Sequence, residues 1–316
     1  MNWIIRNYRN CDEQAVVKLW NNCLTRDPIN ADIFHKRILL DVNFDQRSHF
    51  VAESDGEIVG YAYGMYRIYP YEDRGIEPNR GWVQIIFVAE SYRRSGIGRA
   101  LVTAVETQLQ SLGKTEIGVA NYSPFYFFPG PDRDVYPQAV AFFKALGYAD
   151  LTDAVGMDIV LYDFAIPEEV LELERKLFVE GYSIKIFAGE YTLSIIQFMK
   201  NNFPGGWVRN IRECLLKNNG ERDCVICVDH DDNIVGFALR AIDDLPGHFG
   251  PFGVVEQLRS QGLGKVLFYK MLYHMYCEGT YHCWLAWTGG KAQKFYERAG
   301  MRVCKRHAIM KKIIEG

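Results

Sequence analysis

Two short glycine-containing segments are the parts of this sequence whose residue types and spacing best suit ligand chemistry. The first contains Gly96 and Gly98, and the second contains Gly262 and Gly264. Glycine has no side chain, so the backbone N–H groups of such a segment can approach a ligand closely. Where the segment opens a helix, unpaired N–H groups and the positive end of the helix dipole attract anions. Both segments therefore predict a cradle for a phosphate or pyrophosphate group.

Positively charged side chains accompany both glycine segments. They are Arg93, Arg94 and Arg99 in the first, and Arg259 and Lys265 in the second. Neither segment completes the Gly-x-Gly-x-x-Gly fingerprint of dinucleotide-binding proteins or the Gly-Lys-Ser/Thr loop of ATP-binding proteins. For either segment taken alone, a tight strand-to-helix turn without a ligand is the alternative.

The glycine segments belong to an internal repeat that covers most of the chain. A similar hairpin precedes both segments, at residues 55–60 and at residues 231–236. A short helix that ends at a glycine and is followed by an apolar strand comes after both, at residues 139–148 and 291–301. The repeat therefore predicts two domains of the same fold.

The first half carries two insertions relative to the second. One is rich in tyrosine, over residues 61–71, and the other is the aromatic segment 125–131. Long insertions are often functional loops, and variable surface is the alternative. Part of the tyrosine segment alternates with a period of two, which indicates either one face of a strand or an aromatic wall for a ligand.

The glycine segments within this repeat resemble the signature of the GNAT superfamily of acyl-CoA-dependent N-acyltransferases, which reads Arg/Gln-x-x-Gly-x-Gly/Ala. Residues 93–98 and 259–264 both fit it without a gap. The resemblance extends from the hairpin to the last helix of each half and implies a tandem GNAT protein. The implied fold class is α/β (α+β), with two GNAT-like domains, each a mixed, mostly antiparallel sheet flanked by helices.

We place the domain boundaries between the two copies of the repeat. The N-terminal GNAT-like domain is expected over residues 1–163 and the C-terminal one over residues 182–316. Residues 164–181 are expected to form a linker helix, which begins at Pro167 and ends at Gly181.

The resemblance implies acetyl-CoA as the co-substrate, lying in an opening beside the strand that ends near Val88 or Val254. The pyrophosphate is expected on the N–H groups of residues 94–99 or 260–265, and strand backbone beside the thioester would polarise its carbonyl. Pro251 removes one backbone donor from the second strand. The expected cofactor-binding residues are Val88, Arg93, Arg94, Ser95, Gly96, Ile97, Gly98 and Arg99 in the first half, and Val254, Arg259, Ser260, Gln261, Gly262, Leu263, Gly264 and Lys265 in the second.

Acyl transfer to an amine needs an acid that protonates the leaving thiolate. The resemblance implies a tyrosine on the last helix, and Tyr296 occupies that position in the second half. Phe143 replaces it in the first half and cannot donate a proton. Tyr296 packing with its hydroxyl at the surface is the alternative, as is a first half that uses Tyr126 or Tyr136 as its acid.

The reaction also needs a base that accepts a proton from the ammonium group of the acceptor. The resemblance places this base early on the strand before the glycine motif, where the second half has His248 and the first half has Trp82. Histidine suits the role because its ordinary pKa is near neutral. Asp243, Asp244 and Glu256 are the other candidates, and a purely structural His248 is the alternative.

The predicted function is N-acetyl transfer from acetyl-CoA to a primary amine by direct attack, with the chemistry in the C-terminal domain. The alternatives are a non-catalytic acyl-CoA-binding or sensing protein, and transfer carried out by the N-terminal domain. We expect a small-molecule amine as the acceptor and a monomer or homodimer as the assembly.

Composition narrows the function classes further. Lys and Arg total 36 and Asp and Glu total 39 among 316 residues, so the net charge of −3 argues against nucleic acid as a partner. No apolar run is long enough for a membrane span, and no signal peptide is apparent, so we expect no membrane partner and a cytoplasmic protein. Cys224 and Cys227 form a CxxC without a second spaced pair, which favours a strand core over a metal site.

Overall fold

The structure is a computed structural model that describes residues 2–314. The chain divides into two compact units, which we call unit 1 (residues 1–154 and 305–316) and unit 2 (residues 155–304). Within residues 2–314, no helix is both long and apolar enough to cross a bilayer.

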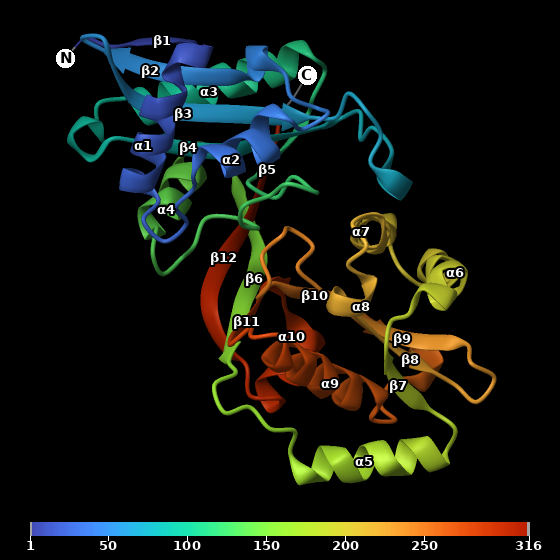
Figure 1. The fold of residues 1–316 in the computed structure, drawn as a ribbon. Helices are drawn as coiled ribbons and strands as arrows, with labels where there is room; N and C mark the ends of the chain where they lie inside the picture. The colour runs from blue at the N-terminus through green and yellow to red at the C-terminus, as the bar shows by residue number, and fades with distance from the viewer. Residues whose placement is uncertain (1, 315–316) are drawn as a thin grey trace. The chain divides into compact units, whose positions relative to one another are not determined.

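Unit 1 is built on a sheet with the strand order β1-β2-β3-β4-β5-β12-β6 (Figure 1). Its strands are β1 (Ile4–Asn7), β2 (His49–Ser54), β3 (Glu57–Tyr66), β4 (Arg80–Val88), β5 (Glu116–Val119), and parts of β6 (Ala149–Val160) and β12 (Arg302–Ile313). Its helices are α1 (Glu13–Cys23), α2 (Ala31–Phe34), a π-helical turn at His35–Leu39, α3 (Ile97–Ser111) and α4 (Pro137–Ala145), with short 3-10 turns at Asn10–Asp12, Gln46–Ser48, Glu72–Arg74 and Glu90–Tyr92.

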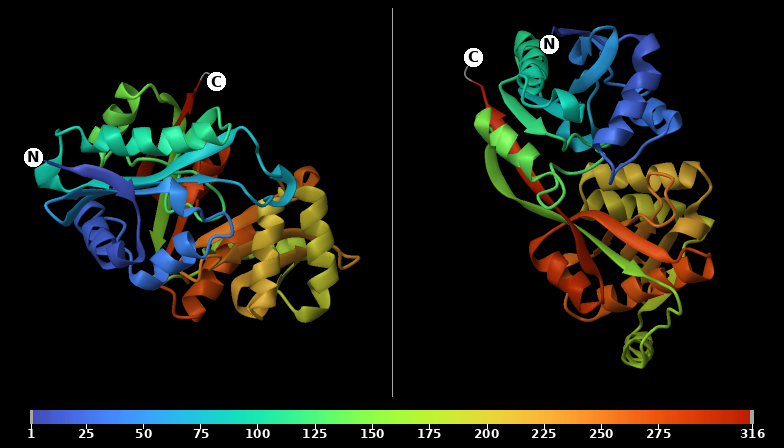
Figure 2. Two further views of the ribbon diagram at one scale, coloured as in Figure 1. Left: turned by 90° about the horizontal axis from the view of Figure 1, so that it is seen from above. Right: turned by 90° about the vertical axis from the view of Figure 1, so that its left-hand side faces the viewer.

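Helices cover both faces of the sheet in unit 1. Figure 2 shows α3 on one face and α1 on the other. Leu101, Val105 and Leu109 recur every four residues along α3, so they form one buried stripe that packs on the sheet. On the opposite face, Tyr61 and Tyr63 of β3 are fully buried. This part of the tyrosine-rich insertion is therefore one face of a core strand.

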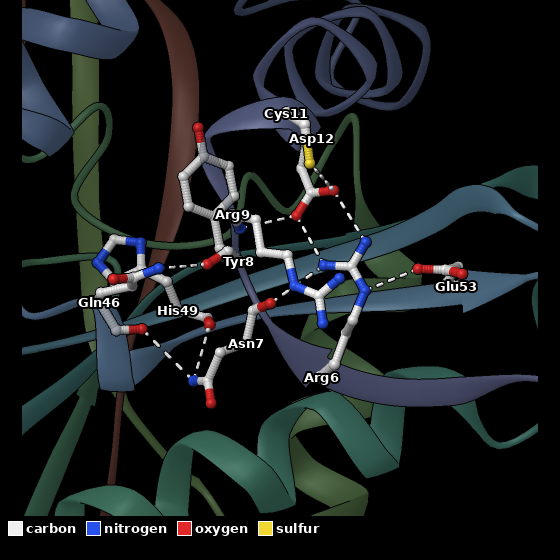
Figure 3. Close-up of polar contacts among 9 residues, drawn as sticks. All are labelled: Arg6, Asn7, Tyr8, Arg9, Cys11, Asp12, Gln46, His49 and Glu53. Atoms are coloured by element: carbon white, nitrogen blue, oxygen red, sulfur yellow. Dashed lines mark hydrogen bonds and ion pairs between the residues drawn. The ribbon is translucent and has the colours of Figure 1, made fainter.

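The edge strand β1 is tied to its surroundings by a charged network (Figure 3). Arg6 lies 2.7 Å from a carboxylate oxygen of Asp12 and 2.7 Å from one of Glu53 on β2. Asp12 also accepts a hydrogen bond from the backbone N–H of Arg9 at 2.8 Å. These contacts hold the start of the chain against β2.

Unit 2 repeats this plan with a four-stranded sheet in the order β10-β9-β8-β7 and a separate pair of strands, β6 and β11. Its own strands are β7 (Ser183–Ile186), β8 (Cys224–Val228), β9 (Ile234–Arg240), β10 (Phe249–Val254) and β11 (His282–Thr288). Its helices are α5 (Glu168–Val179), α6 (Thr192–Asn202), α7 (Gly205–Leu216), α8 (Gly220–Asp223), α9 (Leu263–Cys277) and α10 (Gly290–Arg298), with 3-10 turns at Gly189–Tyr191 and Glu256–Leu258. Cys224 and Cys227 are buried on β8, as expected for a strand core.

The strand before each glycine motif separates from its parallel neighbour. In unit 1, residues 80–83 of β4 pair with the parallel strand β5, whereas β4 itself continues to Val88. In unit 2 the contact between the start of β10 and β11 is a single bridge between His248 and Trp284. Each unit therefore has the opening beside this strand that the family resemblance implies.

Each unit contains one strand segment from the other half of the sequence. In unit 1, residues 311–313 of β12 pair with residues 116–118 of β5. In unit 2, residues 155–160 of β6 pair with β11. The compact units thus differ from the repeat-based ranges in these segments: residues 155–163 lie in unit 2, and residues 305–316 lie in unit 1.

Candidate active site

The two glycine loops have nearly the same backbone conformation. Gly96 has φ 93° and ψ −15°, and Gly262 has φ 96° and ψ −12°. Two residues earlier, Arg94 and Ser260 also have positive φ, at 64° and 71°. Left-handed residues of this kind turn successive N–H groups toward a common side and make anion-binding concavities. The sequence repeat is therefore a repeat of loop geometry.

An arginine braces each loop against the strand that precedes it. The Nε of Arg93 donates to the carbonyl oxygen of Val88 at 3.2 Å, and Arg259 donates to Val254 at the same distance. These guanidinium groups hold the end of the strand, so they add positive charge from a fixed position. Arg93 and Arg259, which begin the two motifs, therefore help to position the loops.

The second glycine of each motif lies in the first turn of the following helix. A Cβ on Gly98 would lie 3.4 Å from the ring of Phe142 on α4, and one on Gly264 would lie 3.6 Å from the ring of Phe252 on β10. Phe252 in turn stacks on Phe295 of α10, with ring centroids 5.7 Å apart. This side of each loop adjoins the opening beside β4 or β10.

The two loops differ in how their charged side chains are paired. In unit 1, Arg94 and Arg99 are exposed, and no described residue forms an ion pair with either. In unit 2, the Nζ of Lys265 lies 2.6 Å from a carboxylate oxygen of Glu169 on α5. Unit 1 therefore presents more unpaired positive charge at its loop.

Helix α5 also covers one flank of the loop in unit 2. A Cβ on Gly262 would lie 2.8 Å from the side chain of Leu173, whereas one on Gly96 would lie 3.7 Å from the ring of Trp3. Sequence reasoning placed a helix here but missed its contact with the loop. The run of glutamates from residue 168 to residue 174 was the available signal, because α9 offers lysines to pair with it.

Tyr296 lies on α10 in an aromatic enclosure. Its side chain is 8% exposed. The ring centroids around it, at 5.3–6.4 Å, are those of Phe249, Phe252, Phe268 and Phe295. Burial raises the pKa of the hydroxyl, and no described residue forms a hydrogen bond with it. Such a hydroxyl keeps its proton at neutral pH and is available to a ligand. Phe143 is buried at the matching place on α4.

His248 precedes β10 and is held on two sides. Its Nδ1 lies 2.9 Å from Oδ2 of Asp243, within ion-pair distance but without the alignment of a hydrogen bond. Its ring stacks on Trp284 of β11, with centroids 4.1 Å apart and an interplanar angle of 10°. Trp82, which is fully buried, takes this position in unit 1. Unit 2 is thus the one that brings a proton acceptor to the start of the opening.

The remaining base candidates lie elsewhere. Asp244 pairs with Lys217 at 2.7 Å, on the outside of the hairpin loop. Glu256 is exposed on the turn that follows β10. Asp243, the third carboxylate considered as a base, is the one that lies at the His248 ring, 2.9 Å from Nδ1.

His248 is linked to Tyr296 through its chain neighbour Phe249. Phe249 follows His248 in the chain, and its ring lies 6.1 Å from that of Tyr296. Because neighbouring residues of an extended chain point to opposite faces, the imidazole is expected on the face of the chain opposite to the one where Phe249 meets Tyr296.

Strands β4 and β10 are both irregular at the opening. Gln84 is an extra residue in β4 between the pairs Tyr63–Ile85 and Gly64–Val83. In β10 the register shifts between Phe249 and Phe252, where Pro251 lacks an N–H group. Bulges of this kind often re-aim groups next to active sites. The backbone of β10 offers one donor fewer here.

Comparisons with known proteins agree with this geometry. The model of the "Acetyltransferase (GNAT) family" matches residues 11–127 and 190–301. An acetyltransferase of Pectobacterium atrosepticum is 33% identical over 116 residues, which cover 36% of this chain and 72% of that protein.

Two solved structures with the same fold match this chain over nearly its whole length. A tandem GNAT protein from the clavulanic acid biosynthesis pathway is 17% identical, with a TM-score of 0.65 over 100% of this chain and 99% of that one. A GCN5-related glucosamine N-acetyltransferase region of a fungal multi-domain GH3 beta-N-acetylglucosaminidase is 20% identical, with a TM-score of 0.80. The match covers 98% of this chain and spans 38% of the length of that protein.

Proposed function

Because this chain belongs to the GNAT acetyltransferase family, we propose that it transfers an acetyl group from acetyl-CoA to the amine of a small molecule, with the chemistry in unit 2. One observation carries the choice of unit. Unit 2 has a buried tyrosine on its last helix, Tyr296, and a carboxylate-paired histidine, His248, directly before β10. Unit 1 has Phe143 and Trp82 in their places.

The proposed reaction assigns one proton transfer to each of these side chains. His248 accepts a proton from the ammonium group of the acceptor, and the free amine then attacks the thioester carbonyl carbon. The new C–N bond forms as the C–S bond breaks. The thiolate of CoA leaves and takes a proton from the Tyr296 hydroxyl, whose raised pKa keeps it protonated until then. The nitrogen loses its second proton as the amide forms, and this proton returns to the Tyr296 phenolate, so His248 retains the one proton that the overall reaction releases.

The proposed donor site uses the glycine loop of the same unit. The N–H groups of residues 260–265 would hold the pyrophosphate, and acetyl-CoA supplies the thioester that is attacked. The left-handed backbone of the loop and the arginine brace from Arg259 support this assignment. The acceptor is unidentified, and glucosamine is the first to test because the fungal structural neighbour is described as acting on it.

Two alternatives rest on unit 1. Its loop has the same backbone and carries Arg94 and Arg99 without ion-pair partners in the described chain. This observation favours acyl-CoA binding in unit 1, either as a transfer site or as a binding site without chemistry. A test of the proposal must therefore separate the two loops.

The test is calorimetric titration of acetyl-CoA into the wild type and into the variants Gly98→Asp and Gly264→Asp. Both glycines lie in the first turn of a helix, where an aspartate favours folding but repels a pyrophosphate. Their φ angles are not positive, and Gly264 has room for a Cβ. Gly262 is a poor site for such a variant because its positive φ and its contact with Leu173 would disturb the fold.

We expect Gly264→Asp to remove one acetyl-CoA site and to abolish turnover of glucosamine or another amine in a panel. Gly98→Asp should leave turnover in place. Loss of turnover in Gly98→Asp alone would move the chemistry to unit 1. Binding of acetyl-CoA without turnover of any amine would favour the non-catalytic alternative.

A further inference from the structure

We propose that Asp243 is a positioning residue that holds His248 with its Nε2 turned toward the acceptor. This inference rests on the proposed function of His248 as the base. The carboxylate lies 2.9 Å from Nδ1, and this nitrogen is shielded from solvent. Nδ1 forms no hydrogen bond with any described residue, so the carboxylate acts on it through its charge.

The loop that carries Asp243 is itself anchored. The N–H of Trp284 donates to the carbonyl oxygen of Gly247 at 2.9 Å, and a Cβ on Gly247 would clash with the backbone oxygen of His282 on β11. The N–H of Ala241 donates to the carbonyl oxygen of His248 at 2.7 Å, and that of His248 donates to Leu245 at 2.9 Å. Asp243 and His248 are therefore set at opposite ends of one short, fixed loop.

The chemistry of imidazole gives this contact a consequence. A neutral imidazole carries its proton on one nitrogen and a lone pair on the other. A carboxylate beside Nδ1 favours the proton there, so Nε2 keeps the lone pair that accepts a proton. When His248 becomes an imidazolium, the same carboxylate and the face of Trp284 stabilise its charge. Asp243 thus selects the tautomer and stabilises the protonated form.

Unit 1 offers an internal contrast. Trp82 takes the place of His248 in β4, and its Nε1 is buried without a hydrogen-bond partner in the described chain. An indole has no second nitrogen to act as a base. A carboxylate does stand five residues before Trp82, but it is Glu77, which pairs with Arg67 and Arg80. The pair of a histidine and a carboxylate at its ring nitrogen therefore occurs at this position in unit 2 and not in unit 1.

The first test does not depend on the acceptor. Nitrogen-15 NMR of histidine-labelled wild type, with His248 assigned by comparison with His248→Gln, reports which ring nitrogen carries the proton at neutral pH. We expect the Nδ1–H form for His248, and a larger Nε2–H fraction in Asp243→Asn. A wild-type His248 protonated at Nε2 would overturn the proposal.

The second test is kinetic and uses acetyl-CoA with glucosamine, or with the amine that turns over best. Asp243→Asn keeps an oxygen for the loop but loses the charge, so kcat should fall about 10–100-fold with the KM for acetyl-CoA unchanged. Asp243→Glu should restore part of kcat. Asp244→Asn is the matched control, because it removes the neighbouring charge from a surface ion pair with Lys217 and should act as wild type.

The outcomes separate the inference from the proposed function. If His248→Gln abolishes turnover while Asp243→Asn acts as wild type, the positioning role is wrong and the base assignment stands. If His248→Gln retains full turnover, the base assignment fails and the positioning role fails with it. If Asp243→Asn and Asp244→Asn lose kcat equally, the effect is one of general charge, and the proposal is overturned.

Discussion

Tyr296 and Phe143 stand at the same place on the last helix of the two units, and they differ by one oxygen atom. Both are buried among apolar side chains, so either residue suits the packing. The hydroxyl of Tyr296 forms no hydrogen bond with a described residue, and its ring lies among phenylalanine rings. If Tyr296 is the proposed acid, removing its hydroxyl should affect turnover and not folding.

Tyr296→Phe is therefore expected to fold as wild type and to lower kcat by about 10²-fold or more, the range of a general acid. Burial raises the pKa of the phenol, so it stays protonated as the pH rises through the range where an ordinary tyrosine ionises. The ratio of wild-type to variant kcat should stay constant from about pH 6 to about pH 10. Steady-state kinetics across that range measures it.

Tyr269→Phe is the matched control, since Tyr269 is another buried tyrosine of unit 2 and its hydroxyl lies 3.4 Å from a backbone oxygen. It should leave kcat unchanged. A ratio for Tyr296→Phe that falls toward one above pH 9 would mean that the phenol ionises in the ordinary range, against the effect of its burial.

Helix α5 is the element that distinguishes the two glycine loops. Two ion pairs join it to α9: Glu169 with Lys265 at 2.6 Å, and Glu174 with Lys270 at 3.0 Å. Exposed pairs of this kind contribute little to stability. The packing of Leu173 against Gly262 is the stronger constraint, because there is no room for a methyl group between them.

We expect Gly262→Ala to destabilise the protein by about 2–4 kcal/mol, from a positive φ that costs about 1–2 kcal/mol and from overpacking against Leu173. Gly96→Ala has the same positive φ, but its Cβ would meet the Trp3 ring at an ordinary contact distance, so about 1–2 kcal/mol is expected. Urea unfolding of the two variants measures the difference.

A double variant shows whether contact with α5 causes the extra loss of stability in Gly262→Ala. In Leu173→Ala the methyl group of Gly262→Ala has space, so the two substitutions together should cost less than the sum of their separate effects. Equal losses of stability for Gly96→Ala and Gly262→Ala would show that α5 does not press on the loop.

At the scale of the whole molecule, the two halves of the sequence share their last strands. Residues of β12, near the end of the chain, complete the sheet of unit 1 beside β5 and bury Ala308 and Met310 in its core. Lys312 adds an ion pair with Glu106 on α3 at 3.0 Å. Unit 1 therefore depends on residues about 190 positions after β5 along the chain.

Deletion of residues 305–316 should accordingly destabilise unit 1 although it removes only the end of the chain. Loss of the buried Met310 alone should cost roughly 2–5 kcal/mol. Hydrogen exchange should show lost protection at β5, while β8 and β9 in unit 2 keep theirs. Unchanged protection at β5 would contradict the strand pairing described here.

Much of this protein could be predicted from local sequence patterns. The prediction of two GNAT domains is confirmed, since the family matches both halves of the chain. This prediction depended on the spacing of the glycines, which indicates a loop at the start of a helix. The conformation of such a loop depends mainly on its own few residues, because glycine is the residue that adopts a positive φ easily. The assignment of the CxxC to a strand core rested on the lack of a second spaced pair of ligands and on the alignment of this segment with a strand of the first half. The roles of Tyr296 and His248, and the exact domain boundaries, stay predictions.

Only the tertiary structure decided which distant residues meet. Glu169 and Lys265 are separated by 96 positions, and the pairing of β12 with β5 spans nearly 200. Nothing in the local pattern around His248 identifies Asp243, rather than Asp244 beside it, as the carboxylate at its Nδ1. Local geometry is determined by the conformational preferences of a few adjacent residues. The contacts that distinguish the two units arise from packing over the whole chain, where a repeat in sequence does not require a repeat in partners.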